Sequence, residues 1–198
     1  MIFISIAVAL AAGLVSAAPK VPGSDLPLSD LVWTGPVVPN GPNVTFTGTA
    51  ESVLNEILKI NPEYAPEEHY VAGGVGKKSS IEKRNKDGII CNIPGRFSGD
   101  TIWSRAFEQY QYLNGLGGAC GVQANSCVRI SCSWGSGVHL CNDNNYFIQP
   151  NCRYLASYAL DILNECTTWV NEDWAVGYVN GQEFDTDRYN VIVSSSNC

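Results

Sequence analysis

Hydrophobic residues at helical spacing mark three segments of the chain. The first lies within NVTFTGTAESVLNEILKINPEY, where Val44 and Phe46 alternate as in a short strand before the helical pattern begins. The hydrophobic positions of that helix are Val53, Leu54, Ile57, Leu58 and Ile60. Asn61-Pro62 ends the pattern, because proline disfavours a helical conformation in the residue before it. A helix of about ten residues is marginal alone, so we expect it to dock on the rest of the chain.

The second segment, FSGDTIWSRAFEQYQYLNG, predicts an amphipathic helix of about 13 residues. Ser98 or Asp100 can serve as its N-cap, and Gly115 is a suitable C′ residue at its end. The hydrophobic residues on its neighbouring turns are Trp103, Ala106, Phe107, Tyr110 and Leu113.

The third segment, NCRYLASYALDILNEC, predicts a helix with Asn151 as its N-cap. Its hydrophobic face comprises Leu155, Tyr158, Ala159, Ile162, Leu163 and Cys166. Cys152 and Cys166 stand at its two ends, about 21 Å apart along a helix axis, which is beyond the reach of one disulfide. We therefore expect each cysteine to bond to another element and to pin the helix onto a sheet.

Alternating residues predict two β-hairpins after residue 125. In SCVRISCSWGSGVHLCND, a turn at Ser136-Gly137 would place Cys132 directly opposite Cys141, near enough for a disulfide in a non-hydrogen-bonded pair. In WAVGYVNGQEFDTDRYNVIV, Asn180-Gly181 is the strongest short turn motif. The run RYNVIV that follows has high β-propensity.

The N-terminus has the features of a signal peptide. Residues 1–17 hold an apolar run that ends in the small residues Val15-Ser16-Ala17, which suits cleavage before Ala18. The run is too short for a membrane-spanning helix, which needs ~20 apolar residues. We therefore expect an exported protein.

The eight cysteines all follow residue 84 and predict four disulfides, because an exported chain keeps few thiols unpaired. They are Cys91, Cys120, Cys127, Cys132, Cys141, Cys152, Cys166 and Cys198. No C-x-x-C pair or histidine cluster offers zinc ligands, and the two histidines, His69 and His139, are far apart in the sequence. We expect neither a metal nor another cofactor.

Residues 18–84 have the composition of a removable leader. They contain no cysteine and most of the ten prolines, so we expect extended or loosely ordered chain with one strand and one helix. Asn43-Val44-Thr45 within them is an N-glycosylation sequon. The exposed linker GGVGKKSSIEKRNKDG carries Lys83-Arg84, a pair that kexin-like proteases recognise, with Lys77-Lys78 as a second candidate. Cleavage after Arg84 would leave residues 85–198 as the mature cysteine-rich domain.

The chain is acidic, with a net charge of −7, and residues 85–198 carry six Lys and Arg against eleven Asp and Glu, a net charge of −5. An acidic surface repels phosphate backbones and anionic headgroups. Nucleic acid and membrane are therefore disfavoured as partners. A host or competitor protein, or a neutral glycan, fits better, and we expect a monomer.

Three stretches together resemble a family of secreted ascomycete proteins. They are FTGTAESVLNEILKINPEY before the Lys-Arg pair, SCSWGSGVHLCNDN, and VNGQEFDTDRYNVIVSSSNC. The family is related to the extracellular necrosis-inducing effectors and, more remotely, to fungal killer toxins. The resemblance implies a compact α+β sandwich with two helices on one face of an antiparallel sheet, and a role in host or competitor interaction instead of catalysis.

Catalytic chemistry has few candidates in residues 85–198. A small ribonuclease could use Glu183 with His139 and either Arg129 or Arg188, although a lone strand histidine is more often a surface residue. A glycosidase could use the carboxylate pairs Glu172-Asp173 or Asp185/Asp187, which exposed turns explain better. WGSGVH lacks the spacing of a nucleophile elbow.

Three hypotheses for function follow. The preferred one is a secreted effector or toxin-like virulence protein, released by dibasic cleavage, that acts by binding and not as an enzyme. The second is a secreted small hydrolase. The third is a secreted protease inhibitor, for which the loop Asn142-Asp143-Asn144-Asn145 could present the contact residues.

Overall fold

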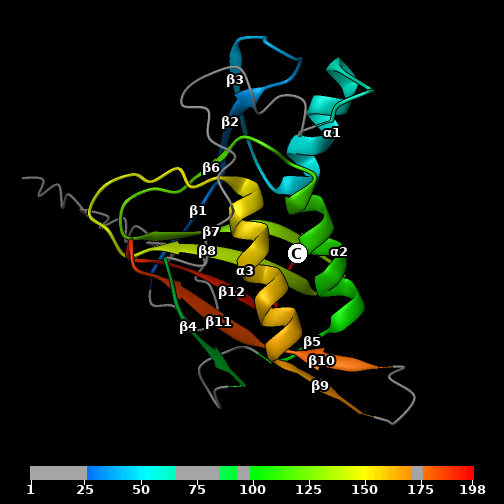
Figure 1. Cartoon of the computed structure of the whole chain (residues 1–198), viewed down its shortest axis with the longest axis vertical. Helices are drawn as coiled ribbons and strands as arrows, with labels where there is room; N and C mark the ends of the chain where they lie inside the picture. Colours follow the sequence, from blue (N-terminus) through cyan, green and yellow to red (C-terminus); the bar gives the residue numbers. More distant parts are fainter. Residues whose placement is uncertain (1–25, 66–84, 93–98, 171–175) are drawn as a thin grey trace, which may run out of the picture.

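The computed structural model describes residues 26–65, 85–92, 99–170 and 176–198. They form an α+β fold, as expected, in which two helices cover one face of a six-stranded sheet (Figure 1). In spatial order the strands of this sheet are β1 (Leu28–Ser29), β7 (Ser126–Ser133), β8 (Ser136–Asn142), β12 (Tyr189–Ser195), β11 (Gly181–Asp185) and β4 (Lys86–Cys91). All neighbours pair antiparallel except β1 and β7, which are parallel.

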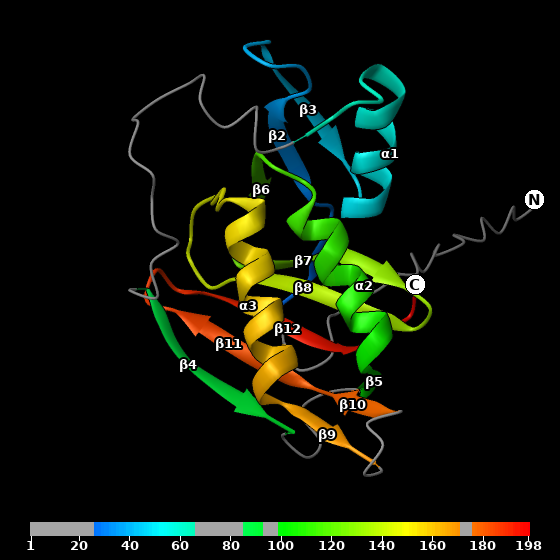
Figure 2. The ribbon, with the colours of Figure 1, turned by 45° about the vertical axis from the view of Figure 1, so that its right-hand side comes forward.

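Two three-stranded sheets flank the helices at opposite ends (Figure 2). One contains β3 (Asn43–Thr47), β2 (Val32–Pro36) and β6 (Ala119–Gly121); the other contains β5 (Thr101–Ile102), β10 (Gly177–Val179) and β9 (Thr167–Trp169). The first joins the N-terminal part of the chain to the cysteine-rich part, because β2 pairs with both β3 and β6.

The helix α2 (Trp103–Asn114) ends beside Gly115 as predicted, but Gly115 is its C-cap in a right-handed conformation and not the C′ residue. Its start differs from the prediction. The N-cap is Ile102, without a side-chain hydrogen bond, whereas Ser98 lies outside the described residues. Asp100 stands too early, because Thr101 and Ile102 pair with β10 before the helix can begin.

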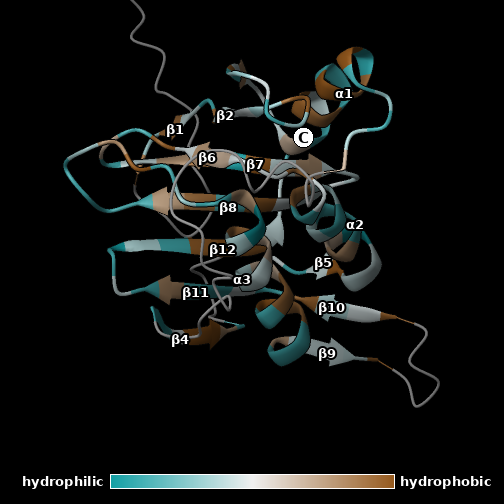
Figure 3. Ribbon diagram, turned by 45° about the horizontal axis from the view of Figure 1, so that its top comes forward, coloured by the Kyte–Doolittle hydropathy of each residue, from teal (hydrophilic) through white to brown (hydrophobic). Residues whose placement is uncertain are grey.

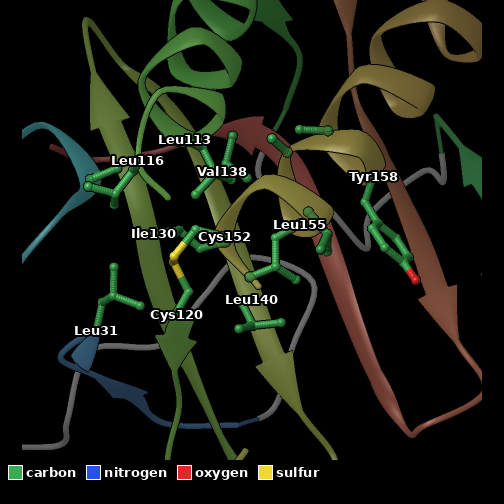
Figure 4. Packing of buried hydrophobic residues seen from close by; sticks show 14 of the residues in the cluster. Leu31, Leu113, Leu116, Cys120, Ile130, Val138, Leu140, Cys152, Leu155 and Tyr158 are labelled. Atoms are coloured by element: carbon green, nitrogen blue, oxygen red, sulfur yellow. A yellow bond between two sulfur atoms is a disulfide. The ribbon is translucent and has the colours of Figure 1, made fainter. Parts of the chain in front are cut away.

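The helix α3 (Cys152–Glu165) confirms the predicted cap, since the Asn151 side chain accepts a hydrogen bond of 3.1 Å from the Tyr154 N–H. Its buried face packs with α2 and the central strands. Figure 4 shows Leu155 of α3 and Leu113 of α2 together with Val138 and Leu140 of β8 in this core.

The hairpin between β7 and β8 turns two residues earlier than predicted. Its two loop residues are Trp134 and Gly135, both at positive φ (53° and 76°), and Ser133 pairs with Ser136. Two positive φ values define the tight turn that matches strand twist. Cys132 therefore lies opposite Gly137, so the predicted Cys132–Cys141 bridge is wrong.

Four disulfides join the eight cysteines: Cys91–Cys166, Cys120–Cys152, Cys127–Cys141 and Cys132–Cys198. Cys141 bonds Cys127 because an irregularity in register between Arg129 and Ser131 brings those two cysteines directly opposite each other. Both ends of α3 are tied to strands, as predicted: Cys152 to β6 and Cys166 to β4. These bonds are compatible with an extracellular protein.

Asn180-Gly181 is not a hairpin turn. The chain passes from β10 through these residues into β11, and the turn that joins β11 to β12 lies at residues 186–188. Gly181 is required by a close approach instead. A Cβ atom there would lie 2.7 Å from Cys166 Sγ and 2.8 Å from Ile162 Cγ2 of α3.

Residues 26–65 belong to the same fold. The predicted strand and helix are confirmed as β3 and α1 (Ala50–Ile60), and the proline-rich stretch before them also contains β1 and β2. Hydrophobic and hydrophilic residues alternate along α1 (Figure 3), and its apolar side buries Val53 and Ile57 in the core. Leu31, from this same part of the chain, lies in the cluster with Ile130 and Leu116 (Figure 4).

Candidate binding site at a hairpin tip

The structure separates the residues of the predicted hydrolase site. His139 on β8 is buried, with 1% of its surface exposed, so the expectation of a surface histidine is wrong. Its Nε2 atom lies 3.3 Å from Ser196 Oγ. Burial, and to a lesser extent the nearby Arg129 charge, lowers the pKa of His139 to about 3. A histidine with this pKa stays neutral at physiological pH.

Glu183 faces the opposite side of the sheet from His139. Glu183 pairs with Val191, whose side chain belongs to the core under the helices, whereas His139 pairs with Ile192, which belongs to a small cluster on the other face. Neighbouring residues of a strand point to opposite faces. The sheet therefore lies between the two groups, and they cannot act as one acid–base pair.

Glu183 is instead part of a buried charged group beneath α3. Lys86 Nζ lies 3.7 Å from Glu183 Oε2, contacts Asp161, and stands 4.4 Å from the centre of the Tyr158 ring. Burial raises the pKa of Glu183 to about 7, and the Lys86 charge opposes this shift only in part. This group ties β4 and β11 to α3.

One of the carboxylates considered for a glycosidase, that of Asp185, holds structural hydrogen bonds. Asp185 is buried, not exposed as expected, and accepts hydrogen bonds from the Tyr158 hydroxyl and, at 2.7 Å, from the Asp187 N–H. Asp187 is exposed in the same turn, as is Arg188. Glu172 and Asp173 lie outside the described residues.

Only two of the four residues in the loop considered for protease inhibition are exposed. Asn142 and Asn144 are buried, and Asn142 Nδ2 donates to the Tyr146 carbonyl at 2.8 Å. Asn144 Nδ2 donates to the Asp187 carbonyl, also at 2.8 Å. These two side chains hold the loop in place, which leaves Asp143 and Asn145 as its exposed members.

The most unusual exposed residue is Trp134, at the turn between β7 and β8. It is 72% exposed, the largest value among the large hydrophobic side chains that the structure describes. Its φ of +53° lies in the left-handed region, where a bulky side chain is an outlier. An exposed side chain in a costly backbone conformation often marks a functional position.

The backbone around Trp134 is held from three directions. Arg105 Nη1 on α2 donates to the Trp134 carbonyl at 2.7 Å, and the Ser196 N–H donates to the Gly135 carbonyl at 3.0 Å. The Cys132–Cys198 disulfide fixes the strand just before the turn. We name residues 133–136 the Trp134 tip. It presents an aromatic side chain on a rigid support, as preorganised binding residues require.

SWGSG contains two glycines close together, and a prediction that places the turn at the second of them, Gly137, does not identify Trp134 as a turn residue. The motif that could have identified it is Trp-Gly between two alternating stretches, with glycine at the second position of a two-residue turn.

Of the predicted modification sites, the structure describes only Asn43. Asn43 is exposed at the start of β3, the edge strand of its sheet, where a glycan can be accommodated. Lys83 and Arg84, and also Lys77 and Lys78, lie outside the described residues.

Among the described residues no cluster of three or more potential metal ligands is found. None of the helices in this part of the chain has the length and hydrophobicity to cross a bilayer. No protein-family model, curated protein or solved structure matches the chain.

Proposed function

We propose that this chain is the precursor of a secreted effector or toxin-like protein that acts by binding a host or competitor protein. Residues 1–17 are its signal peptide, and cleavage after Arg84 processes it. The observation that carries the binding role is Trp134, a bulky, exposed side chain held in a left-handed conformation on a braced turn. Tryptophan is among the residues that most often dominate the energy of protein interfaces.

Charge favours a protein with an apolar pocket and an acidic rim as the target. Arg105 is exposed, and its guanidinium reaches the Trp134 carbonyl, so one positive charge stands at the base of the Trp134 tip on a chain that is acidic as a whole. A cation at the base of the turn that carries the aromatic side chain suits a pocket bordered by carboxylates.

The cysteine distribution and the resemblance support an extracellular role. Four disulfides brace residues 91–198, and such bonds persist outside the cell. SCSWGSGVHLCNDN, one of the stretches that resemble secreted ascomycete effectors, contains the Trp134 tip. The separation of His139 from Glu183 by the sheet speaks against a hydrolase built on that pair.

The binding role is tested with the secreted protein and two matched variants. Trp134→Asn removes the ring at a turn position that asparagine tolerates. Tyr146→Asn is the control, because Tyr146 is also an exposed aromatic (59%) but lies in another loop. Each fluorescently labelled protein is added to plant leaf tissue and to yeast cells, and bound protein, necrosis and growth inhibition are measured.

We expect the wild type and Tyr146→Asn to bind and to produce the same response, and Trp134→Asn to lose at least tenfold in binding. Full binding by Trp134→Asn, or no binding by the wild type to either cell type, would overturn the proposal. Intact-mass measurement of the secreted material tests processing separately. A dominant species that remains covalently continuous across Arg84 would exclude the proposed cleavage.

A further inference from the structure

The cysteines lie in only one of the two parts of the chain. All eight cysteines lie at or after Cys91, and all eight pair with one another. No disulfide therefore joins residues 1–84 to the rest. A cut after Arg84 would leave two polypeptides that only non-covalent contacts hold together.

The two parts of the chain share one hydrophobic core. Six apolar residues of the N-terminal part are buried in one cluster with residues of α2, α3 and β7: Leu31, Trp33, Val37, Ala50, Val53 and Ile57. Trp33 is completely buried, and its Nε1–H donates to the Gly117 carbonyl at 2.6 Å. Burial of apolar surface is the main favourable term in protein association.

The Trp33 site is shaped for the indole ring. Gly118 has a φ of +76°, and a Cβ atom there would lie 2.9 Å from Trp33 Nε1 and 2.7 Å from the Thr34 carbonyl oxygen. Glycine at this position lets the two backbones approach each other. The ring also stacks on Phe46 of β3, with 5.8 Å between centroids.

Backbone pairing joins the N-terminal part to the rest of the chain at two places. Val32, Trp33 and Thr34 of β2 pair with Gly121, Cys120 and Ala119 of β6. β1 adds a parallel strand to the edge of the main sheet, and the Cys127 N–H donates to the Pro27 carbonyl at 2.8 Å. The N-terminal part thus completes one sheet and extends another.

A partly buried polar contact at the start of α1 also joins the two parts. Glu51 Oε1 accepts a 3.1 Å hydrogen bond from the Cys132 N–H and contacts the Ser131 hydroxyl. Ser131 and its neighbour Gln109 are completely buried. Loss of the Glu51 carboxylate would leave the amide and the hydroxyl without this acceptor, which is costly in a buried setting.

We propose that residues 26–65 remain bound after cleavage, as the smaller subunit of a non-covalent two-chain protein. The inference rests on the proposed cleavage and concerns what the cut leaves behind. The binding site is the surface formed by β6, the Gly117-Gly118 turn, the β7 edge and the Ser131–Cys132 backbone. Its occupant is the chain's own N-terminal segment, which therefore acts as part of the folded protein instead of a discarded leader.

The experiment uses the full secreted chain with a site-specific protease sequence in place of residues 79–84, so that the cut does not depend on kexin. After complete cutting, size exclusion at micromolar concentration and native mass spectrometry are run without reductant. We expect one species in which the two chains are present 1:1. Guanidinium should separate them without reductant. An N-terminal chain that elutes alone under native conditions would overturn the proposal.

Two variants and a control locate the interaction. Trp33→Ala and Glu51→Leu should each increase dissociation of the cut protein at least tenfold, as measured by dilution followed by native mass spectrometry. Leu58→Ala, on the solvent side of α1 (37% exposed), should leave dissociation unchanged. Glu51→Leu removes the acceptor oxygen at a similar side-chain size, and it still tests the interface if Trp33→Ala does not fold. Equal dissociation of Glu51→Leu and Leu58→Ala would exclude the polar contact as a determinant.

The outcome is independent of the binding role proposed above. Retention of the N-terminal chain is measured on purified protein without any target. A protein that keeps both chains but binds neither cell type would sustain this inference and refute the proposed function. A protein that binds through Trp134 but sheds its N-terminal chain would do the reverse.

Discussion

Replacement of Trp134 by asparagine should make the protein more stable while it removes the proposed contact residue. A left-handed conformation costs an ordinary residue about 1–2 kcal/mol, and asparagine tolerates it better. The ring buries little, because 72% of the residue is exposed. Unfolded chains themselves bury roughly 10–40% of their extended surface. The Trp134 ring therefore buries almost no additional surface on folding, and the hydrophobic free energy that it contributes to stability is near zero. The free energy of unfolding should therefore rise by about 1 kcal/mol.

The assay is chemical denaturation of wild type, Trp134→Asn and Trp134→Ala under non-reducing conditions. Alanine removes the ring but keeps the strain, so Trp134→Ala should match the wild type. Trp134→Asn should gain about 2–4 °C in melting temperature, as expected for a protein of this size. Destabilisation of both variants by more than about 1 kcal/mol would refute the reasoning, because the ring would then have a packing role.

Gly181→Ala should lower the free energy of unfolding by about 1–3 kcal/mol, because its Cβ would lie 2.7 Å from Cys166 Sγ; denaturant titration checks this. His139 is neutral in the fold down to about pH 3, whereas the unfolded chain takes up that proton near pH 6.5. Stability should therefore fall as pH decreases through this window, and His139→Gln should reduce the fall. Glu183 keeps its proton up to about pH 7 in the fold but loses it near 4.5 when unfolded. The contribution of Glu183 to the free energy of unfolding is therefore lost as pH rises between these values. Glu183→Gln should reduce this pH dependence in the same titrations. Asn43→Gln should remove one glycan's mass from the uncut precursor on a gel.

Elements that depend on local interactions could be predicted from the sequence. Helix α3 was predictable because its cap, Asn151, and its hydrophobic face lie within one short segment. The consequence that Cys152 and Cys166 bond to different strands followed from helix length alone. β12 was predictable because its run of β-branched residues is continuous.

Glycines caused two of the errors. Gly137 and Gly181 both suggested turns, but each allows a close approach between segments distant in the sequence. A Cβ atom at Gly137 would lie 2.6 Å from Ser196 Cβ, which only the folded register of β8 and the C-terminal residues brings near. A single sequence does not distinguish a glycine that bends the chain from one that gives room to a neighbour.

The burial of His139 and the role of residues 26–65 could not be predicted for a related reason. Whether a strand residue is buried depends on what covers its face. A proline-rich stretch forms strands only where a partner edge is available. The strand β2 exists because β3 and β6 flank it on opposite sides in the sheet, and β6 (Ala119–Gly121) lies far from it in the sequence.

The position of β4 has a consequence for the durability of the processed protein. A newly created chain start is normally a place where the backbone frays and aminopeptidases trim residues one at a time. Here the carbonyl of Asn85 already accepts a 2.8 Å hydrogen bond from the Thr186 N–H, and Cys91 anchors the far end of the strand to α3. An exopeptidase would thus meet a paired strand almost at once, so the proposed cut after Arg84 would leave an end that resists trimming by such enzymes.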